Sequence, residues 1–531
     1  MKSLHILLLL LLSGAVAPNS FAETKTSALS EKDIPQSYRT GVVRKLSLQE
    51  ALKLAITQNL DIAIAEENTE ISTFQLKSAK GDFEPLLSAN YNRSQGTRPP
   101  FNTNEGPLGS SIENIDDIWN LSISKRFQTA TQLTLSAGIT RNESNSQNSI
   151  GVANDNSTNN LVFGSSLFAE IRQPLLRGFS FDLDVPRAQI LRAEFTSDNA
   201  ALEQKSSLMR ITVETIRAYW DLFEQISAYK VQKTSLELAL KQDQVTKKQI
   251  DAGLRAPSDA LGSQSVVSSR QLALVSAEAA IQTSANELRR ILNLPLDQWK
   301  RPLVTSDVPD FTDDTASKKE LKENALANRP EIAQFKNRAA SNQLDLRLVK
   351  NERLPTVDLQ ANLGTNGLDP SFGTSFSQAA DANTRRWGVG VVLSWAPLGQ
   401  KARADIQVTK RNQANLKRET ERFLVTLHQE VESASIQLSA AGKSVVAAKA
   451  FLDIAEKSLN AEERKFVNGT SSNFVVGQRQ EELAGARQAY LRALVGYQNA
   501  KANAERTEGL VLERNNIVTT IKKSAEQSSH L

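Results

Sequence analysis

Residues 59–91 read NLDIAIAEENTEISTFQLKSAKGDFEPLLSANY, and a similar stretch, RPEIAQFKNRAASNQLDLRLVKNERLPTVDLQANL, occupies residues 329–363. Ile62, Leu76 and Pro85 of the first stretch match identical residues of the second, each 270 positions later. After each copy come strand-like segments that end at a proline, and then a very long helical run that is interrupted once at a glycine. The chain therefore contains one structural unit twice, and the unit combines strands with a helical hairpin.

The first 22 residues have the features of a secretory signal peptide. Lys2 supplies the charged start, residues 6–12 form an unbroken apolar core, and Ser20 to Ala22 form a cleavage site of the small-x-small type. We expect the mature chain to begin at Glu23. No later stretch approaches the ~18 apolar residues of a membrane-spanning helix, so we expect no transmembrane helix, and any membrane insertion would use β-strands.

The composition excludes several classes of protein. The formal net charge is only +4 in 531 residues, and the excess is spread along the chain, so we interpret it as an ordinary solvated surface without a nucleic-acid-binding patch. Cysteine is absent, and there are only two methionines and three histidines. Disulfides and acyl anchors on cysteine are therefore excluded, soft-metal sites are hard to build, and we expect neither a metal ion nor a cofactor.

Heptad spacing predicts long helices in both halves. In the second half, large residues and alanines recur on two rows: Leu424, Val431, Leu438, Val445, Leu452, Leu459 and Phe466, and Leu427, Ala434, Ala441, Ala448 and Ala455. In the first half, one row consists of Leu208, Thr215, Leu222, Tyr229 and Leu236. These rows predict tightly packed antiparallel hairpins, with Ala441 and Ala448 close to a neighbouring helix. An isolated coiled-coil stalk is the simpler alternative, and the flanking strands argue against it.

Alternation of apolar with small or polar residues predicts strands before each hairpin. Residues 357–363 and 387–395 alternate in this way over about 10 positions, which is the length of a strand in a transmembrane barrel. A half-buried strand in a soluble sandwich would have the same period. The export signal and the long polar segments 96–117, 143–160 and 366–385 favour the barrel.

The order of these segments resembles that of the TolC-type outer-membrane efflux proteins. The matching motifs are Leu46–Leu52, Gln173–Gly178, Gly253–Leu254 with Asp259, Asn468–Thr470, and Tyr497 to Gly509. The resemblance covers roughly residues 44–515, and it rests on the order and spacing of motifs that are not decisive singly. It implies an α+β membrane protein, in which a duplicated unit of transmembrane β-strands and long antiparallel coiled-coil hairpins contributes to a trimeric β-barrel and an α-helical periplasmic tunnel.

We expect eight segments along the chain. They are a signal peptide (1–22), short N-terminal helices (23–85), barrel strands of the first half (86–174), the first helical hairpin (186–294), a linker with short helices (295–353), barrel strands of the second half (354–397), the second helical hairpin (400–513) and a disordered tail (514–531). Residues 294–314 are proline-rich and are expected to be irregular.

The resemblance also implies partners. It implies a homotrimer in the outer membrane of a Gram-negative bacterium, in contact with outer-membrane lipid and with its helices in the periplasm. The hairpin tips would meet a periplasmic adaptor (membrane fusion) protein that bridges to an inner-membrane transporter of RND or ABC type. The candidate adaptor-contact and tunnel-tip residues are Gly253, Leu254, Asp259, Gly469, Thr470 and Ser471. Without the resemblance, the two glycines indicate helix ends, and that role holds in either case.

The second tip departs from the family pattern. The best-known members place an arginine two residues after the glycine, with aspartates further on, and close the tunnel by ion pairing. This sequence has Ser471, Val475 and Gln478 at those positions, although Asp259 is present at the first tip. Either other contacts hold the closed state, or the pore is less tightly shut.

The implied function is a passive exit duct for efflux or type I secretion, and not an enzyme. The sequence contains no phosphate loop, no nucleophile elbow and no histidine-rich cluster, and its scattered Asp, Glu and Ser residues are explained as helix surface. The alternative is a non-channel periplasmic coiled-coil structural protein, which would be soluble after cell fractionation.

The first half contains more strand-like stretches than the second. Four lie between Pro85 and Pro174, at residues 86–95, 118–128, 132–142 and 161–173. The connection Thr129–Thr131 is short while its neighbours are long, which is the pattern of turns and loops in a membrane barrel. We therefore expect six strands per chain and an eighteen-stranded trimeric barrel, where the family usually has twelve. The competing reading is that residues 97–160 form an excursion outside the membrane.

Overall fold

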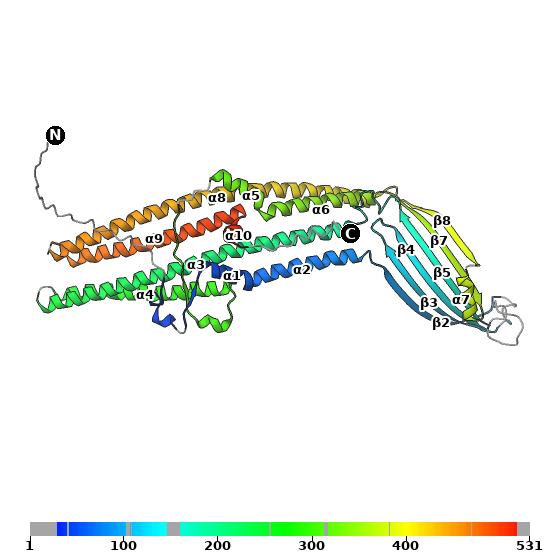
Figure 1. Cartoon of the computed structure of the whole chain (residues 1–531), viewed down its shortest axis with the longest axis horizontal. Coiled ribbons are helices and arrows are strands. Elements are labelled where there is room, and N and C mark those ends of the chain that lie inside the picture. Colours follow the sequence, from blue (N-terminus) through cyan, green and yellow to red (C-terminus); the bar gives the residue numbers. More distant parts are fainter. Residues whose placement is uncertain are drawn as a thin grey trace, which may run out of the picture.

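The computed structural model describes residues 29–39, 42–101, 107, 109–145, 160–253, 256–312, 317–381, 383–468 and 470–517. The described part is elongated, with a helical body and an antiparallel sheet at one end (Figure 1). The predicted signal peptide at residues 1–22 and the chain beyond residue 517 lie outside the described residues.

The repeat in the sequence reappears as two pairs of short helices. The pairs are α1 (Leu48–Gln58) with α2 (Leu60–Gly81), and α5 (Lys318–Asn328) with α6 (Pro330–Glu352). Corresponding helices start 270 residues apart, and so do the strands that follow them, at Leu86 and Thr356. Ser47 begins α1 with the predicted capping box, since its hydroxyl accepts a bond from the Glu50 amide and the Glu50 carboxylate accepts one from the Ser47 amide. The predicted duplication is confirmed.

Each half continues into a long antiparallel helical hairpin. The hairpins are α3 (Ala188–Asp251) with α4 (Ser258–Ile291), and α8 (Gln400–Val467) with α9 (Asn473–Glu508). Helix α3 has 64 residues and α8 has 68, so each is about 100 Å long at ~1.5 Å per residue. Helix α3 also packs on α9, which joins the two hairpins side by side (Figure 1).

Most of the predicted heptad rows lie in the hairpin seams. The buried members are Leu208, Thr215, Leu222 and Tyr229 on α3, and Val431, Leu438, Val445, Leu452 and Leu459 on α8. Leu424 is exposed, but Leu427, Ala434 and Ala455 of the second predicted row are buried as well, so the seam of α8 begins at Leu427. Ala441 and Ala448 are half-buried and line a groove of about 730 Å³ between α8 and α9. Ala441 also packs against the buried cluster that includes Leu438 of α8 and Leu494 of α9, as predicted, whereas the close packing of Ala448 stays a prediction.

The connection between the halves is more regular than predicted. Residues 294–314 contain a 3-10 turn (Leu296–Lys300) and strand β6 (Leu303–Thr305), which pairs in parallel with β1 (Arg44–Leu46). The fully buried Tyr219 of α3 holds this ladder, since its hydroxyl donates to the Leu46 carbonyl oxygen over 3.0 Å. Burial raises the pKa of the Tyr219 phenol. Strands of three residues are too short to show alternation, so the sequence pattern does not reveal them. The remaining short elements are η1 (Glu31–Asp33), η2 (Gln36–Tyr38) and α10 (Val511–Arg514).

Six strands form one continuous antiparallel sheet at the far end of the helical body (Figure 1). Their order is β2 (Leu86–Arg98), β3 (Ile112–Arg126), β4 (Gln132–Ser144), β5 (Asn160–Pro174), β7 (Thr356–Asp369) and β8 (Arg385–Ser394). Strand β3 pairs with β2 as well as with β4, and β4 pairs with β5. The β3–β4 hairpin therefore pairs with the rest of the sheet and not only with itself, and whether it lies inside the membrane stays a prediction. The sheet of the single chain is open, with β2 and β8 as its edges.

The polar segment 366–385, predicted as a loop, contains helix α7 (Phe372–Ala380). It packs on β5 and β7, where the Ser375 and Ser165 hydroxyl oxygens lie 3.0 Å apart. A Cβ at Gly367 would lie 1.8 Å from the Ser375 carbonyl oxygen, so the close approach of α7 requires glycine there. The prediction missed this helix because its serines and its flanking polar residues have the composition of a loop.

Candidate channel-forming and docking surfaces

The sheet has an apolar face, whose residues cross all six strands, and a more polar face. A row of register-paired residues on one face is apolar on every strand: Leu87, Ile123, Leu135, Ala169, Leu363 and Trp387. A row on the other face consists of Asn90, Asn120, Gly138, Ser166 and Asn366. In the single chain, Leu87 is 63% and Trp387 75% exposed to solvent. A sheet with this division suits a wall between lipid and water.

On the apolar face, a buried carboxylate joins the β3–β4 hairpin to the neighbouring strand β2. Asp117 of β3 is buried and accepts a hydrogen bond of 2.7 Å from the Tyr91 hydroxyl of β2. The Arg141 guanidinium of β4 donates to the same carboxylate over 3.0 Å, and Arg93 of β2 lies 3.6 Å away. The Tyr91 ring stacks on the Trp119 ring with centroids 5.2 Å apart. These contacts join three strands at the end of the sheet that lies away from the helices.

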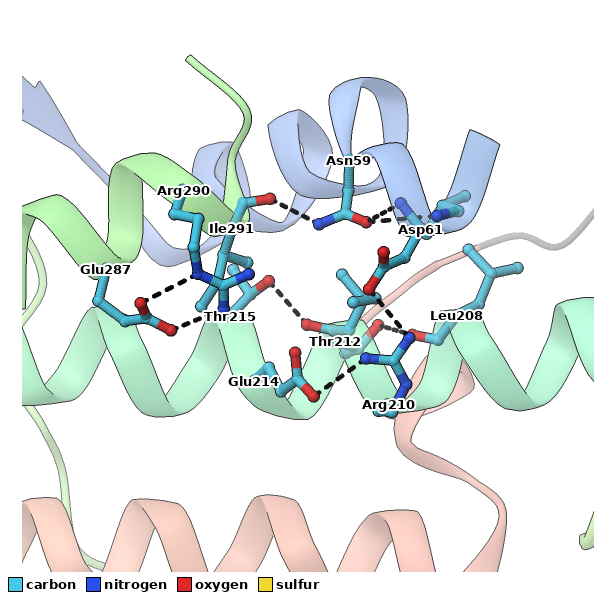
Figure 2. Close-up of polar contacts among 12 residues, drawn as sticks. Asn59, Asp61, Leu208, Arg210, Thr212, Glu214, Thr215, Glu287, Arg290 and Ile291 are labelled. Atoms are coloured by element: carbon cyan, nitrogen blue, oxygen red, sulfur yellow. Dashed lines mark hydrogen bonds and ion pairs between the residues drawn. The ribbon is translucent and has the colours of Figure 1, made fainter. Parts of the chain in front are cut away.

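One asparagine connects the first helical hairpin to the short helices above it (Figure 2). The Asn59 side-chain oxygen accepts hydrogen bonds from the Asp61 and Ile62 amides and so caps the start of α2. The Asn59 amide group donates to the Ile291 carbonyl oxygen over 2.8 Å, at the end of α4. Each end would otherwise leave backbone groups unpaired, so Asn59 makes α4 and α2 meet end to end. Arg210 of α3 adds an ion pair of 3.2 Å to Asp61.

In the second half of the chain, the junction between the long hairpin and the short helices is held by a different side chain at the equivalent position of the repeat. Arg329 stands 270 residues after Asn59 and is the N-cap residue of α6, without a side-chain cap bond. Its buried guanidinium makes ion pairs of 3.0 Å with Glu331 and with Glu430 of α8. The end of α9 is fixed by Gly509, whose φ of +82° is left-handed and whose Cα faces the Asn328 backbone closely.

The first hairpin tip is at the end of the helices that lies away from the sheet. Gly253 has a φ of +71° and ends α3, as predicted for a left-handed turn. Asp259 lies in the first turn of α4 and is exposed, while Leu254 lies outside the described residues. Two turns back, Asp243 pairs with Lys247 at 2.6 Å and accepts a bond from Ser263 of α4. Those bonds lower the pKa of the Asp243 carboxyl and hold the two helices together just behind the tip.

The second tip is stabilised by hydroxyl groups. The Thr470 amide and hydroxyl both donate to the Lys465 carbonyl oxygen, at 2.9 and 3.1 Å. Ser471 donates to the Glu462 carboxylate, which lowers the pKa of that carboxyl, and Ser472 caps α9. Gly469 lies outside the described residues. The predicted site residues that the structure describes therefore fall at two separate tips.

An ion pair links the hairpins a few turns behind the tips. Arg270 of α4 lies 3.2 Å from Glu481 of α9. The sequence analysis did not identify this pair, because the two residues are far apart along the chain and no motif marks them.

None of the helices in the described part of the chain combines the length and the apolarity needed to cross a bilayer.

The chain combines a long helical body with a two-faced sheet, and both features recur in known proteins. A family of proteins described as "Outer membrane efflux protein" matches residues 321–506. The nodulation protein T of Rhizobium leguminosarum bv. trifolii is 21% identical over 315 residues, which are 59% of this chain and 66%, just under two thirds, of that protein.

Solved structures of similar fold are outer-membrane channels. The Campylobacter jejuni CmeC channel has a TM-score of 0.63 at 13% identity, covering 87% of this chain and 86% of that one. The open state of the Neisseria gonorrhoeae MtrE channel has a TM-score of 0.61 at 15% identity, covering 94% and 97%. The Vibrio cholerae outer membrane protein VceC has a TM-score of 0.61 at 13% identity, covering 87% of this chain and 96% of that one. Residues 321–506 thus match the family of outer membrane efflux proteins, and the chain shares the fold of these solved channels.

Proposed function

We propose that the protein is the passive exit duct of a tripartite efflux or type I secretion system, and that it works as a homotrimer. The observation that carries this proposal is the sheet with one apolar and one polar face, attached to helices about 100 Å long. The apolar face meets outer-membrane lipid, the polar face lines the exit, and the helices form the tunnel beneath it.

A trimer supplies what one chain lacks. The edges of the sheet, β2 and β8, carry backbone groups that need partners in lipid, and a closed ring of copies provides them. The long helices of one chain lie alongside one another and do not close a ring, so they enclose a tunnel only when copies stand side by side (Figure 1).

The hairpin tips are the docking surface for the other components. A periplasmic adaptor contacts Gly253, Leu254 and Asp259 at one tip and Gly469, Thr470 and Ser471 at the other, and it connects the duct to an RND or ABC pump. What supports this is the position of the described members, Gly253, Asp259, Thr470 and Ser471, at the end of the hairpins away from the sheet. The pump, and not the duct, selects the cargo.

Replacing Gly253 with valine tests the docking role. The substitution forces a β-branched residue into a left-handed turn, so export should fall strongly while the outer-membrane trimer remains assembled. Gly262→Ala in α4, where a Cβ meets no other atom within 4 Å, is the control and should export normally. Unchanged export by Gly253→Val would contradict the docking surface, and recovery of the wild-type protein in the soluble periplasmic fraction would favour the structural coiled coil.

Cysteine crosslinking maps the contact directly, because the chain has no native cysteine. Ser471→Cys should crosslink to the adaptor. Ser111→Cys, just before β3 at the far end of the sheet, should not. Equal crosslinking of the two variants would show that the tips are not the docking surface.

A further inference from the structure

We propose that three copies of this chain close a membrane barrel of eighteen strands, in which β8 of one copy pairs with β2 of the next. The inference rests on the trimer of the proposed function and deepens it by fixing the width of the exit. A family barrel of twelve strands would use only four strands per chain, whereas the sheet here has six.

The added hairpin lies at the same depth as the other strands. Strand β3 is in register with β2 from Leu86 opposite Ser124 to Arg98 opposite Ile112, which is the full length of β2. The apolar row from Leu87 to Trp387 crosses β3 and β4 without a break. An excursion packed above the membrane would not share this row, so β3 and β4 belong to the membrane wall.

The two edges of the sheet fit each other. In the part of the chain that the structure describes, β2 and β8 each pair on one side only, and their residues are almost all exposed. Because the number of strands is even, β8 and β2 run antiparallel, so a second copy can continue the ladder with the pairing that all the other neighbours use. Three such contacts are related by one rotation, which closes a ring.

The faces also continue across that contact. Leu87, Ala89 and Tyr91 of β2 lie on the apolar face, as do Val389, Val391 and Leu393 of β8. Joining β8 to β2 of the next copy therefore extends the apolar face on the outside and the polar face on the inside. At the subunit boundary, the apolar face therefore stays in contact with lipid and the polar face with water.

The width of the sheet matches the helices beneath it. Next to the sheet, α2 packs on α3, α3 on α6 and α6 on α8, so four helices form the wall of each chain (Figure 1). At an interaxial distance of ~10 Å these helices span about 40 Å of circumference. A strand spacing of ~4.8 Å and a tilt of ~45° give roughly 7 Å per strand, so six strands also span about 40 Å, whereas four span only about 27 Å. Six strands per chain thus continue the tunnel at an unchanged width.

Depth in the bilayer tests the proposal. A bimane fluorophore attached to Leu135→Cys on β4 should be quenched by brominated lipid when the trimer is reconstituted in vesicles. The same label at Val391→Cys on β8 is the positive control, because β8 spans the membrane with either strand number, and a label at Ser472→Cys at the tip is the negative control. Quenching at Val391 without quenching at Leu135 overturns the eighteen-stranded barrel and leaves the duct intact. Absence of quenching at both positions overturns the duct itself.

Disulfide trapping tests which strands are neighbours in the membrane. The pair Ser88→Cys and Ser122→Cys joins β2 to β3 and should crosslink within a chain. Cysteines at the even positions of β8, such as Gly390→Cys, should crosslink with Asn90→Cys to give covalent trimers. A crosslink between Ser88→Cys and Phe168→Cys, on β2 and β5, requires the four-stranded arrangement and would overturn the proposal.

Discussion

The two halves of the chain keep the same helices and differ in their sheets. The short helices start 270 residues apart and the long helices are of nearly equal length, yet the first half contributes β2 to β5 and the second only β7 and β8. The extra hairpin, β3–β4, lies between β2 and β5. Because it adds two antiparallel strands, it leaves the directions of β2 and β5 unchanged. The comparison teaches that such a sheet can gain strands in pairs while the order and length of the helices below it stay the same.

The junctions between long and short helices teach the complementary lesson. In the first half Asn59 caps one helix and donates to the end of another, whereas in the second half Arg329 at the same place of the repeat makes ion pairs with Glu331 and Glu430. The two halves share the arrangement of their helices at this junction, but different polar contacts stabilise it in each half. Substitutions at equivalent positions should therefore have unequal effects.

The largest effect is expected from Gly509→Val, at the end of α9. The residue has a φ of +82°, and a Cβ there would lie 2.8 Å from the Asn328 carbonyl carbon, so valine adds backbone strain to a clash with fixed atoms. Such backbone strain alone costs ~1–3 kcal/mol, and we expect Gly509→Val to lower the free energy of unfolding of the purified protein by more than that. Gly477→Ala, inside α9 where nothing lies within 4 Å, should instead stabilise by up to ~1 kcal/mol. Similar stabilities for both variants would show that the junction does not need its left-handed turn.

Arg329→Ala and Asn59→Ala compare the two junctions directly. Removing the buried Arg329 leaves two carboxylates without their partner, which should cost roughly 3 kcal/mol. Removing the Asn59 cap should cost ~1–2 kcal/mol. Arg338→Ala breaks an exposed pair with Glu419 and should cost under ~1 kcal/mol in the same unfolding measurement. Equal losses at Arg329 and Asn59 would mean that the junctions are energetically alike despite their different contacts.

The pH dependence of stability should also differ near the second junction. Burial raises the pKa of the Glu508 carboxyl above its ordinary value of 4.5, although Arg514 at 2.6 Å acts in the opposite direction. The folded state therefore binds more protons than the unfolded state above pH 4.5, so the contribution of Glu508 to stability falls as the pH rises through that window.

Glu508→Gln removes this charge with little change of shape. The variant should be more heat-resistant than the wild type at neutral pH, and the advantage should shrink as the pH falls toward 4.5. Glu513→Gln, an exposed residue of α10, serves as the control and should leave the melting curves unchanged. An advantage of Glu508→Gln that stays constant with pH would rule out the buried charge as its cause.

Features that follow from a periodic sequence pattern could be predicted from the sequence. Contacts between single residues from distant parts of the chain could not. The repeat, the hairpins, the turn at Gly253 and the alternating strands follow from spacing that many residues share. The ladder of β1 with β6, the packing of α7, and the double role of Asn59 depend on a few residues brought together from distant parts of the chain. The ion pair of Arg270 with Glu481 is of the same kind. In the candidate site, the sequence spacing correctly predicted that Gly253 and Asp259 lie at a hairpin tip. It could not predict the hydrogen bonds of the Thr470 and Ser471 hydroxyls, because these depend on the folded turn.

The smallest effect is expected from Ala448→Leu, on the alanine row of α8. Ala455 lies one heptad further along the same row and is buried, so Ala455→Leu should overpack the seam and cost ~1–3 kcal/mol. Ala448 is half-buried and lines the groove of about 730 Å³ between α8 and α9, where the added carbons of leucine find space. Its substitution should change the free energy of unfolding by less than ~0.5 kcal/mol. A cost at Ala448 equal to that at Ala455 would show that the groove is filled in the protein as it assembles, by a side chain or by a helix of another copy.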